Sequence, residues 1–64
     1  MNLSEITALP PAARAQHYRA LAEKARGDAS EANDSEYISY LIMAEEWERL
    51  ALLADKEAAA RAAK

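Results

Sequence analysis

The chain has 64 residues, no cysteine, one histidine and a formal net charge of −3. It is too short for more than one domain, has no thiol for a disulfide framework or a thiolate metal site, and lacks the clustered positive charge that binds nucleic acid. One glycine and two prolines, among abundant Ala, Glu and Leu, predict an all-α fold.

A short N-terminal helical turn is expected over residues 4–9, with Ser4 as its N-cap. Apolar residues recur here at a spacing of three: Leu3, Ile6 and Leu9. Pro10 and Pro11 end this segment, because proline keeps the residue before it out of the α region. One of the two prolines should also open the next helix, since its fixed φ suits the first helical position.

The first long helix is predicted over residues 11–32. At about 100° per residue, its small and apolar side chains form one stripe: Ala15, Tyr18, Leu21, Ala22, Ala25, Ala29 and Ala32. Gly27 leaves two interpretations open. The helix can continue through it, or it can end just before it, because glycine often stands directly after the end of a helix. We expect the helix to continue to about Ala32, since Ala29 and Ala32 extend the stripe in phase.

The second long helix is predicted over residues 35–60. Asn33 and Glu36 have the spacing of a capping box, which places the start of the helix here. Its inward stripe carries larger side chains: Tyr37, Tyr40, Met43, Ala44, Trp47, Leu50, Ala51, Ala54 and Ala58. The residues from Lys56 onward have little apolar surface to bury and are expected to fray.

The short connection requires the two long helices to run antiparallel as a hairpin. Small residues on the first helix then face large residues on the second, which favours close packing. The predicted hairpin core comprises Tyr18, Leu21, Ala22, Ala25, Tyr40, Ala44, Trp47, Leu50 and Ala51. Aromatic residues can also form a stacking platform for a ligand, but helical spacing favours the core.

Several large aliphatic residues of the second long helix lie at the edges of its inward stripe or outside it. They form a predicted partner interface: Ile38, Leu41, Ile42, Leu52 and Leu53. An alanine-rich seam buries little apolar area, and a helix that is apolar on all sides is normally covered on all sides. We therefore expect a homo-oligomer, with a C2 dimer that forms a four-helix bundle as the leading form.

No catalytic, cofactor or metal site is expected. His17 lacks the glutamate of a Glu-x-x-His motif, because Arg14 occupies that position. The acidic group Glu45, Glu46 and Glu48 lies on one helix and is interpreted as solvating charge. The serines have the positions of capping or surface residues and not of a nucleophile beside a base. The sequence therefore predicts that the chain is not an enzyme.

Two segments carry related motifs. Residues 18–26 read Tyr-Arg-Ala-Leu-Ala-Glu-Lys-Ala-Arg, and residues 40–51 read Tyr-Leu-Ile-Met-Ala-Glu-Glu-Trp-Glu-Arg-Leu-Ala. In this respect the chain resembles short, uncharacterised bacterial helical-hairpin proteins. The resemblance implies a helical hairpin and no particular mechanism. Ile42 and Met43 depart from that family, which often has polar or smaller residues there, and the departure favours an additional apolar contact.

Two classes of function are compatible with these features. The first is an interaction or structural protein that self-associates, and the second is a small regulatory adaptor that docks Ile38, Ile42 and Leu53 onto a larger protein. A membrane-surface helix would need basic residues beside its apolar face, and the second long helix is acidic. The N-terminal residues resemble no signal peptide, so we expect a cytoplasmic protein.

Overall fold

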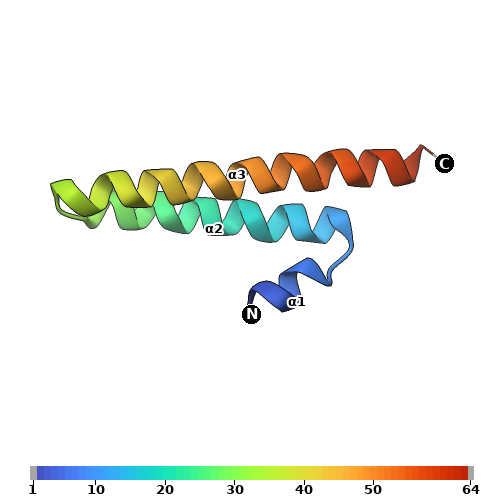
Figure 1. Ribbon diagram of the computed structural model, residues 1–64, viewed down its shortest axis with the longest axis horizontal. Helices are drawn as coiled ribbons and strands as arrows, with labels where there is room; N and C mark the ends of the chain where they lie inside the picture. The colour runs from blue at the N-terminus through green and yellow to red at the C-terminus, as the bar shows by residue number, and fades with distance from the viewer. Residues whose placement is uncertain (1, 64) are drawn as a thin grey trace.

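The computed structural model describes residues 2–63, which form three helices (Figure 1). Helix α1 spans Leu3–Thr7, α2 spans Pro11–Glu31 and α3 spans Asp34–Ala62. Helices α2 and α3 lie side by side and run in opposite directions, and the C-terminal end of α3 projects beyond α2 (Figure 1). Because residues 2–63 contain no strand, the prediction of an all-α chain is confirmed.

Asn2 is the N-cap of α1. Its side-chain oxygen accepts a hydrogen bond from the Glu5 backbone N–H at 2.9 Å, and the Glu5 carboxylate accepts one from the Asn2 N–H at 3.0 Å. The prediction of Ser4 as the N-cap is wrong, because Ser4 lies inside the first turn. The reciprocal pair requires Glu or Gln three residues after the cap. Asn2 has Glu5 at that position, whereas Ser4 has Thr7.

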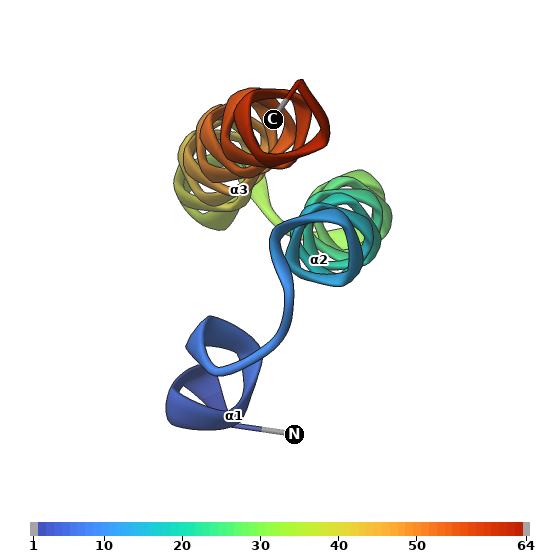
Figure 2. The same ribbon diagram turned by 90° about the vertical axis from the view of Figure 1, so that its right-hand side faces the viewer.

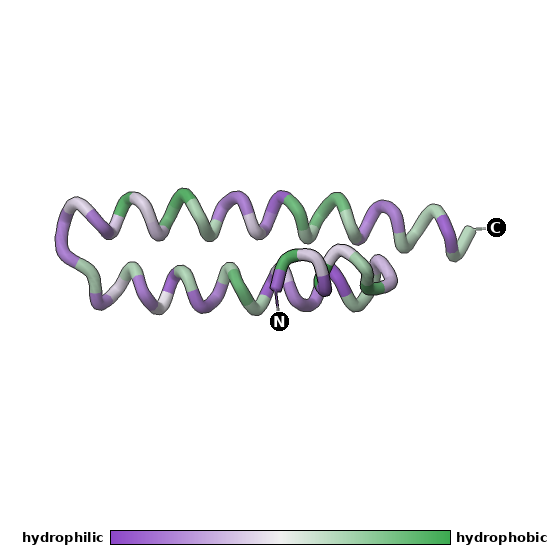
Figure 3. Tube along the Cα trace, turned by 60° about the horizontal axis from the view of Figure 1, so that its bottom comes forward, coloured by the Kyte–Doolittle hydropathy of each residue, from purple (hydrophilic) through white to green (hydrophobic). Residues whose placement is uncertain are grey.

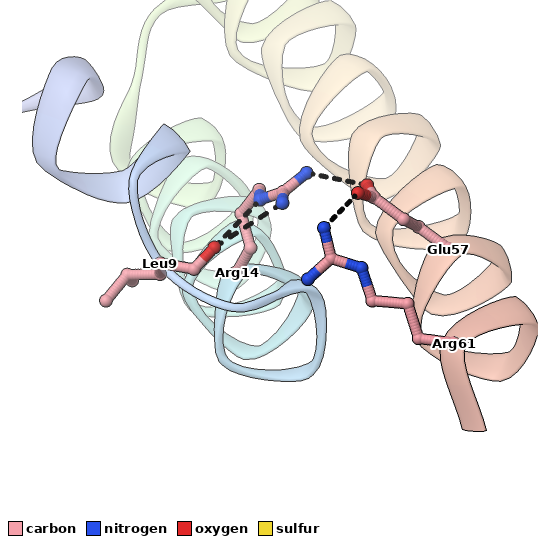
Figure 4. Close-up of polar contacts among 4 residues, drawn as sticks. All are labelled: Leu9, Arg14, Glu57 and Arg61. Atoms are coloured by element: carbon pink, nitrogen blue, oxygen red, sulfur yellow. Dashed lines mark hydrogen bonds and ion pairs between the residues drawn. The ribbon is translucent and has the colours of Figure 1, made fainter. Parts of the chain in front are cut away.

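Arg14 connects the segment before α2 to the last turns of α3. Its guanidinium donates to the Leu9 carbonyl oxygen at 3.4 Å and forms an ion pair with Glu57 at 3.0 Å (Figure 4). Glu57 also accepts from Arg61 at 3.3 Å. The side chain of Arg14 is only 19% exposed, so this network is screened less by solvent than a fully exposed ion pair.

Gly27 lies within α2, which continues to Glu31. No glycine in the described residues has a positive φ, so Gly27 is not a left-handed helix terminator. A Cβ added at this position would meet no other atom within 4 Å. The backbone and the surroundings of Gly27 therefore both accept a side chain.

Asn33 caps α3 by accepting a hydrogen bond from the Glu36 backbone N–H at 3.0 Å. The residues from Lys56 onward, which were expected to fray, are helical as far as Ala62. The basic residue Arg61 lies in the last turn, where a positive charge interacts favourably with the helix dipole.

The contact between α2 and α3 is lined by alanine; we call it the alanine seam. Apart from Ile6, Pro11 and Tyr18, all buried residues between 2 and 63 are alanines: Ala15, Ala22, Ala25, Ala29, Ala44, Ala51 and Ala54. Short methyl side chains let two helices approach closely, but each methyl group removes little apolar area from water. The seam therefore sets the spacing of the helices more than it stabilises them.

Larger side chains gather where α1 meets the pair of long helices. Ile6 and Tyr18 are buried there, and Leu21, Trp47 and Leu50 pack against them partly exposed. The rings of Tyr18 and Trp47 are stacked, with centroids 5.9 Å apart and planes 19° apart. Viewed along the long helices, α1 lies on one side of the pair (Figure 2). Ile6 thus fixes α1 to the long helices.

Replacing Gly27 by alanine should raise the free energy of unfolding by about 0.5–1 kcal/mol, because Ala has the higher helix propensity and its methyl group meets open space. Urea unfolding followed by circular dichroism, at one fixed protein concentration, measures the change. Ala20→Gly, at an exposed position of α2, is the matched control and should lower the free energy by a similar amount. A destabilised Gly27→Ala variant would contradict the helical backbone described at this position.

Replacing Ile6 by alanine should lower the free energy of unfolding by about 2 kcal/mol, because a buried aliphatic side chain is lost from the cluster around Tyr18. The emission of Trp47, the single tryptophan, should shift to the red as water reaches the cluster. Leu3→Ala changes the same helix at a residue that is 56% exposed, and it should cost less than about 0.5 kcal/mol. Equal effects of the two substitutions would contradict the docking of α1 through Ile6.

Candidate interaction surface

The large apolar side chains of α3 lie mostly outside the alanine seam. The exposed large hydrophobic residues in the described chain are Leu3, Tyr37, Ile38, Ile42, Met43, Leu52 and Leu53. Most of the strongly hydrophobic stretches of the long helices belong to α3 (Figure 3). A single exposed aliphatic residue is ordinary, but several on one helix make its surface a candidate for an interaction.

Helical rotation places some of these residues directly opposite the seam. Ile42 lies about 180° around α3 from the buried Ala51, at 100° per residue. Seven further residues of α3 lie within about 40° of Ile42 by the same rotation, and four of them, Ile38, Glu46, Arg49 and Leu53, belong with Ile42 to its middle turns. We call this group the outer face of α3: Ile38, Ile42, Glu46, Arg49 and Leu53.

The outer face carries one acidic and one basic side chain between its apolar residues. Glu46 and Arg49 form an ion pair at 2.6 Å, and both side chains are more than half exposed. The hydrogen bond from Arg49 to Glu46 raises the pKa of Arg49 above its ordinary value. Arg49 is therefore charged throughout the neutral pH range.

An open apolar pocket of about 270 Å³ adjoins the outer face on the side where α1 lies. It is lined by Leu3, Ile42, Met43, Glu46, Trp47 and Leu50. Met43 and Tyr37 were placed in the inward stripe, but each side chain is 46% exposed. The reason is that α2 covers a narrower arc of α3 than the apolar pattern suggested. The apolar surface thus extends from the outer face towards α1.

The opposite flank of the seam is polar. Arg19 pairs with Asp55 and Arg26 pairs with Glu48, so each ion pair joins α2 to α3. The hydrogen bond to Glu48 raises the pKa of Arg26 above its ordinary value. A cleft of about 360 Å³ on this flank is also lined by Ala22, Glu23, Ala51 and Leu52. The charged side chains that line the cleft are of both signs, and Arg19 and Arg26 each pair with a carboxylate of α3. These ion pairs help to align the two helices, and the mixed charge favours neither an anionic nor a cationic ligand.

The residues predicted for the hairpin core fall into two groups. The buried ones are Tyr18, Ala22, Ala25, Ala44 and Ala51, and the half-buried ones are Leu21, Tyr40, Trp47 and Leu50. Tyr18 and Trp47 are in direct ring contact. The core role of Ile6 was missed, although its spacing of three from Leu3 and Leu9 was visible in the sequence.

The residues predicted for the partner interface do not lie on one surface. Ile38, Ile42 and Leu53 belong to the outer face and are at least half exposed. Leu52 is 60% exposed but lines the polar cleft, and Leu41 is half-buried. A flat partner that covers the outer face therefore does not also cover Leu41 and Leu52.

The remaining chemistry of the described chain is limited. Between residues 2 and 63 there is no group of three or more His, Asp or Glu side chains placed to share a metal ion. His17 is half-buried on α2. None of the three helices, within the residues described, combines the length and the hydropathy that a bilayer span requires.

Comparisons with protein-family models, with curated proteins and with solved structures give no match for this chain. The resemblance to short bacterial helical-hairpin proteins therefore stays a prediction.

Proposed function

We propose that the chain is a non-enzymatic interaction or structural module that self-associates through helix packing. Two helical hairpins form a C2 dimer with the architecture of a four-helix bundle. We place the protein in the cytoplasm, because a chain without cysteine fits that reducing compartment. It assigns no reaction, cofactor, nucleic acid or membrane to the chain.

The observation that supports this proposal is the distribution of side-chain size around α3. Alanines occupy the buried side, whereas Ile38, Ile42 and Leu53 are 50–60% exposed. Full burial of one such aliphatic side chain contributes about 1.5–3 kcal/mol. A partner that covers the outer face therefore adds more apolar stabilisation per residue than the alanine seam does.

The dimensions of the chain also support the proposal that a second layer of helices packs against it. The principal extents are 47 × 20 × 13 Å, and the smallest of them is close to the diameter of one helix, about 10–12 Å. Stable domains bury their apolar faces between at least two layers of secondary structure. A second copy supplies the missing layer and covers the same face on both chains.

The alternative is a small regulatory adaptor that docks this face onto a larger protein. The apolar pocket beside α1 favours it, because a groove lined by Leu3, Met43 and Trp47 is wide enough to receive side chains from a partner helix. An adaptor folds as a monomer, whereas the self-associating module gains stability from its second copy.

Replacing Ile42 by glutamate should weaken the dimer by at least about 100-fold, because an unpaired charge is then buried at the centre of the interface. Sedimentation equilibrium over a wide concentration range measures the dissociation constant. Ala20→Glu adds the same charge at an exposed position of α2 and should leave dimerisation unchanged. Circular dichroism of both variants at equal concentration reports whether helix content falls together with the dimer.

A native chain that stays monomeric at several hundred micromolar, and unfolds cooperatively at a temperature independent of concentration, would contradict self-association. An Ile42→Glu variant with native helix content and unchanged oligomeric state, but without affinity for a cellular partner, would support the adaptor instead.

A further inference from the structure

The exposed apolar surface of α3 is not symmetric about the outer face. At 100° per residue, Leu50 lies about 100° from the buried Ala51 in one direction, and Leu52 lies about 100° from it in the other. Leu50 lines the open apolar pocket of about 270 Å³, together with Leu3 and Met43. Leu52 lines the cleft whose arginines pair with carboxylates of α3. The apolar surface therefore continues from the outer face towards one flank of α3 only.

That flank is the one on which α1 lies (Figure 2). Leu3 comes from α1 and is 56% exposed, whereas Met43 and Trp47 come from α3, so the pocket lies between these two helices. Ile6 is the one buried residue of α1, and it packs in the cluster around Tyr18. The position of Leu3, and with it the shape of the pocket, therefore depends on the docking of Ile6.

We propose that a second copy of the chain packs against this flank, with an aliphatic side chain of its own α3 in the pocket and with Leu3 in the contact. In this proposal, which rests on the proposed function, the contact between the copies continues from the outer face to the pocket, and α1 belongs to the interface. Because Ile6 holds α1 in place, dimerisation depends on a helix that is not part of the hairpin.

The size of a stable interface favours a contact that extends beyond the outer face. From Ile38 to Leu53 the outer face measures about 22 Å along a helix about 10–12 Å wide, so its footprint is about 250 Å². A standard protein interface buries about 800 Å² on each partner. A second copy that covered the outer face alone would be held by a narrow strip, whereas the pocket and α1 widen the contact on the side where the added surface is apolar.

The charges on this flank favour a second copy over a strongly charged partner. Glu46 lies at the pocket and pairs with Arg49. Glu57, farther along α3, pairs with Arg14 and Arg61. Because both carboxylates are already paired within the chain, the flank offers little attraction to a basic partner. The whole chain has a net charge of −3, so two copies repel each other unless they meet through a surface of this kind.

Lysine substitutions on the two flanks test the position of the contact. Met43→Lys should weaken the dimer by at least about tenfold, because the symmetry brings the added charge into an apolar contact twice. Leu52→Lys is the matched control, since Leu52 is also an exposed apolar residue of α3 three positions before an acidic one. It should dimerise within about threefold of the native chain. Sedimentation equilibrium measures both dissociation constants, and circular dichroism checks that helix content is native.

Substitutions in α1 test its part in the interface. Leu3→Glu should weaken the dimer by about tenfold, whereas Ser4→Glu adds the same charge at an exposed residue outside the pocket and should have no effect. Both new carboxylates lie in the first turn of α1, where the helix dipole favours negative charge, so the helix itself is retained. Ile6→Ala should also weaken the dimer, because α1 then no longer holds Leu3 at the pocket.

Trp47, the single tryptophan, reports whether the pocket is filled. Its emission should shift to the red when the native dimer dissociates on dilution, because water then reaches the indole ring. The shift should occur at the native concentration in Leu52→Lys and at a higher concentration in Met43→Lys.

Failure of this contact and failure of the proposed function give different results. A native chain that dimerises, but tolerates Met43→Lys or Leu3→Glu or keeps a constant Trp47 emission through dissociation, overturns the contact at the pocket and leaves self-association in place. A dimer weakened by Leu52→Lys and not by Met43→Lys also overturns it, because the contact then lies on the opposite flank. A native chain that remains monomeric overturns both proposals and leaves the pocket to a different protein.

Discussion

The close contact between two alanine-lined helix faces is the constraint on which the rest of this structure depends. Ala22, Ala25, Ala44 and Ala51 are each at most 3% exposed, so no larger side chain fits between α2 and α3 at this spacing. The one large side chain buried in the seam is Tyr18, which lies between Ala15 and Ala22 on α2 and stacks on the half-buried Trp47. The other bulky residues of the two long helices between residues 2 and 63 lie at the edges of the seam or outside it.

Charged residues set how the two long helices are aligned along the seam. The ion pairs of Arg14, Arg19 and Arg26 with carboxylates of α3 follow one another in reverse sequence order, as an antiparallel pair requires. Exposed ion pairs are individually weak, because solvent screens them and their long side chains lose conformational freedom. These ion pairs favour one alignment of α2 along α3, because alanine methyl groups alone interdigitate nearly as well after a shift of one turn.

The two sides of α3 thus have opposite properties. Its buried side is small and fits α2 closely, and its outer face is large, apolar and open to solvent. A core of alanines limits how stable a single chain of this length can be. The same design leaves the residues with the greatest hydrophobic contribution available for a contact between chains, which is why we infer that folding and association are linked in this protein.

Helical periodicity is what the sequence determined by itself. The stripe that contains Ala22 and Ala25, the cap at Asn33 and the outward direction of Ile42 all follow from local spacing, because successive residues of a helix are rotated by a constant angle. Only the tertiary structure decided how wide an arc of α3 is covered by α2, and it leaves Met43 exposed. The docking of α1 through Ile6 was decided there too. Side-chain direction is a local property, whereas burial depends on what the rest of the chain brings alongside.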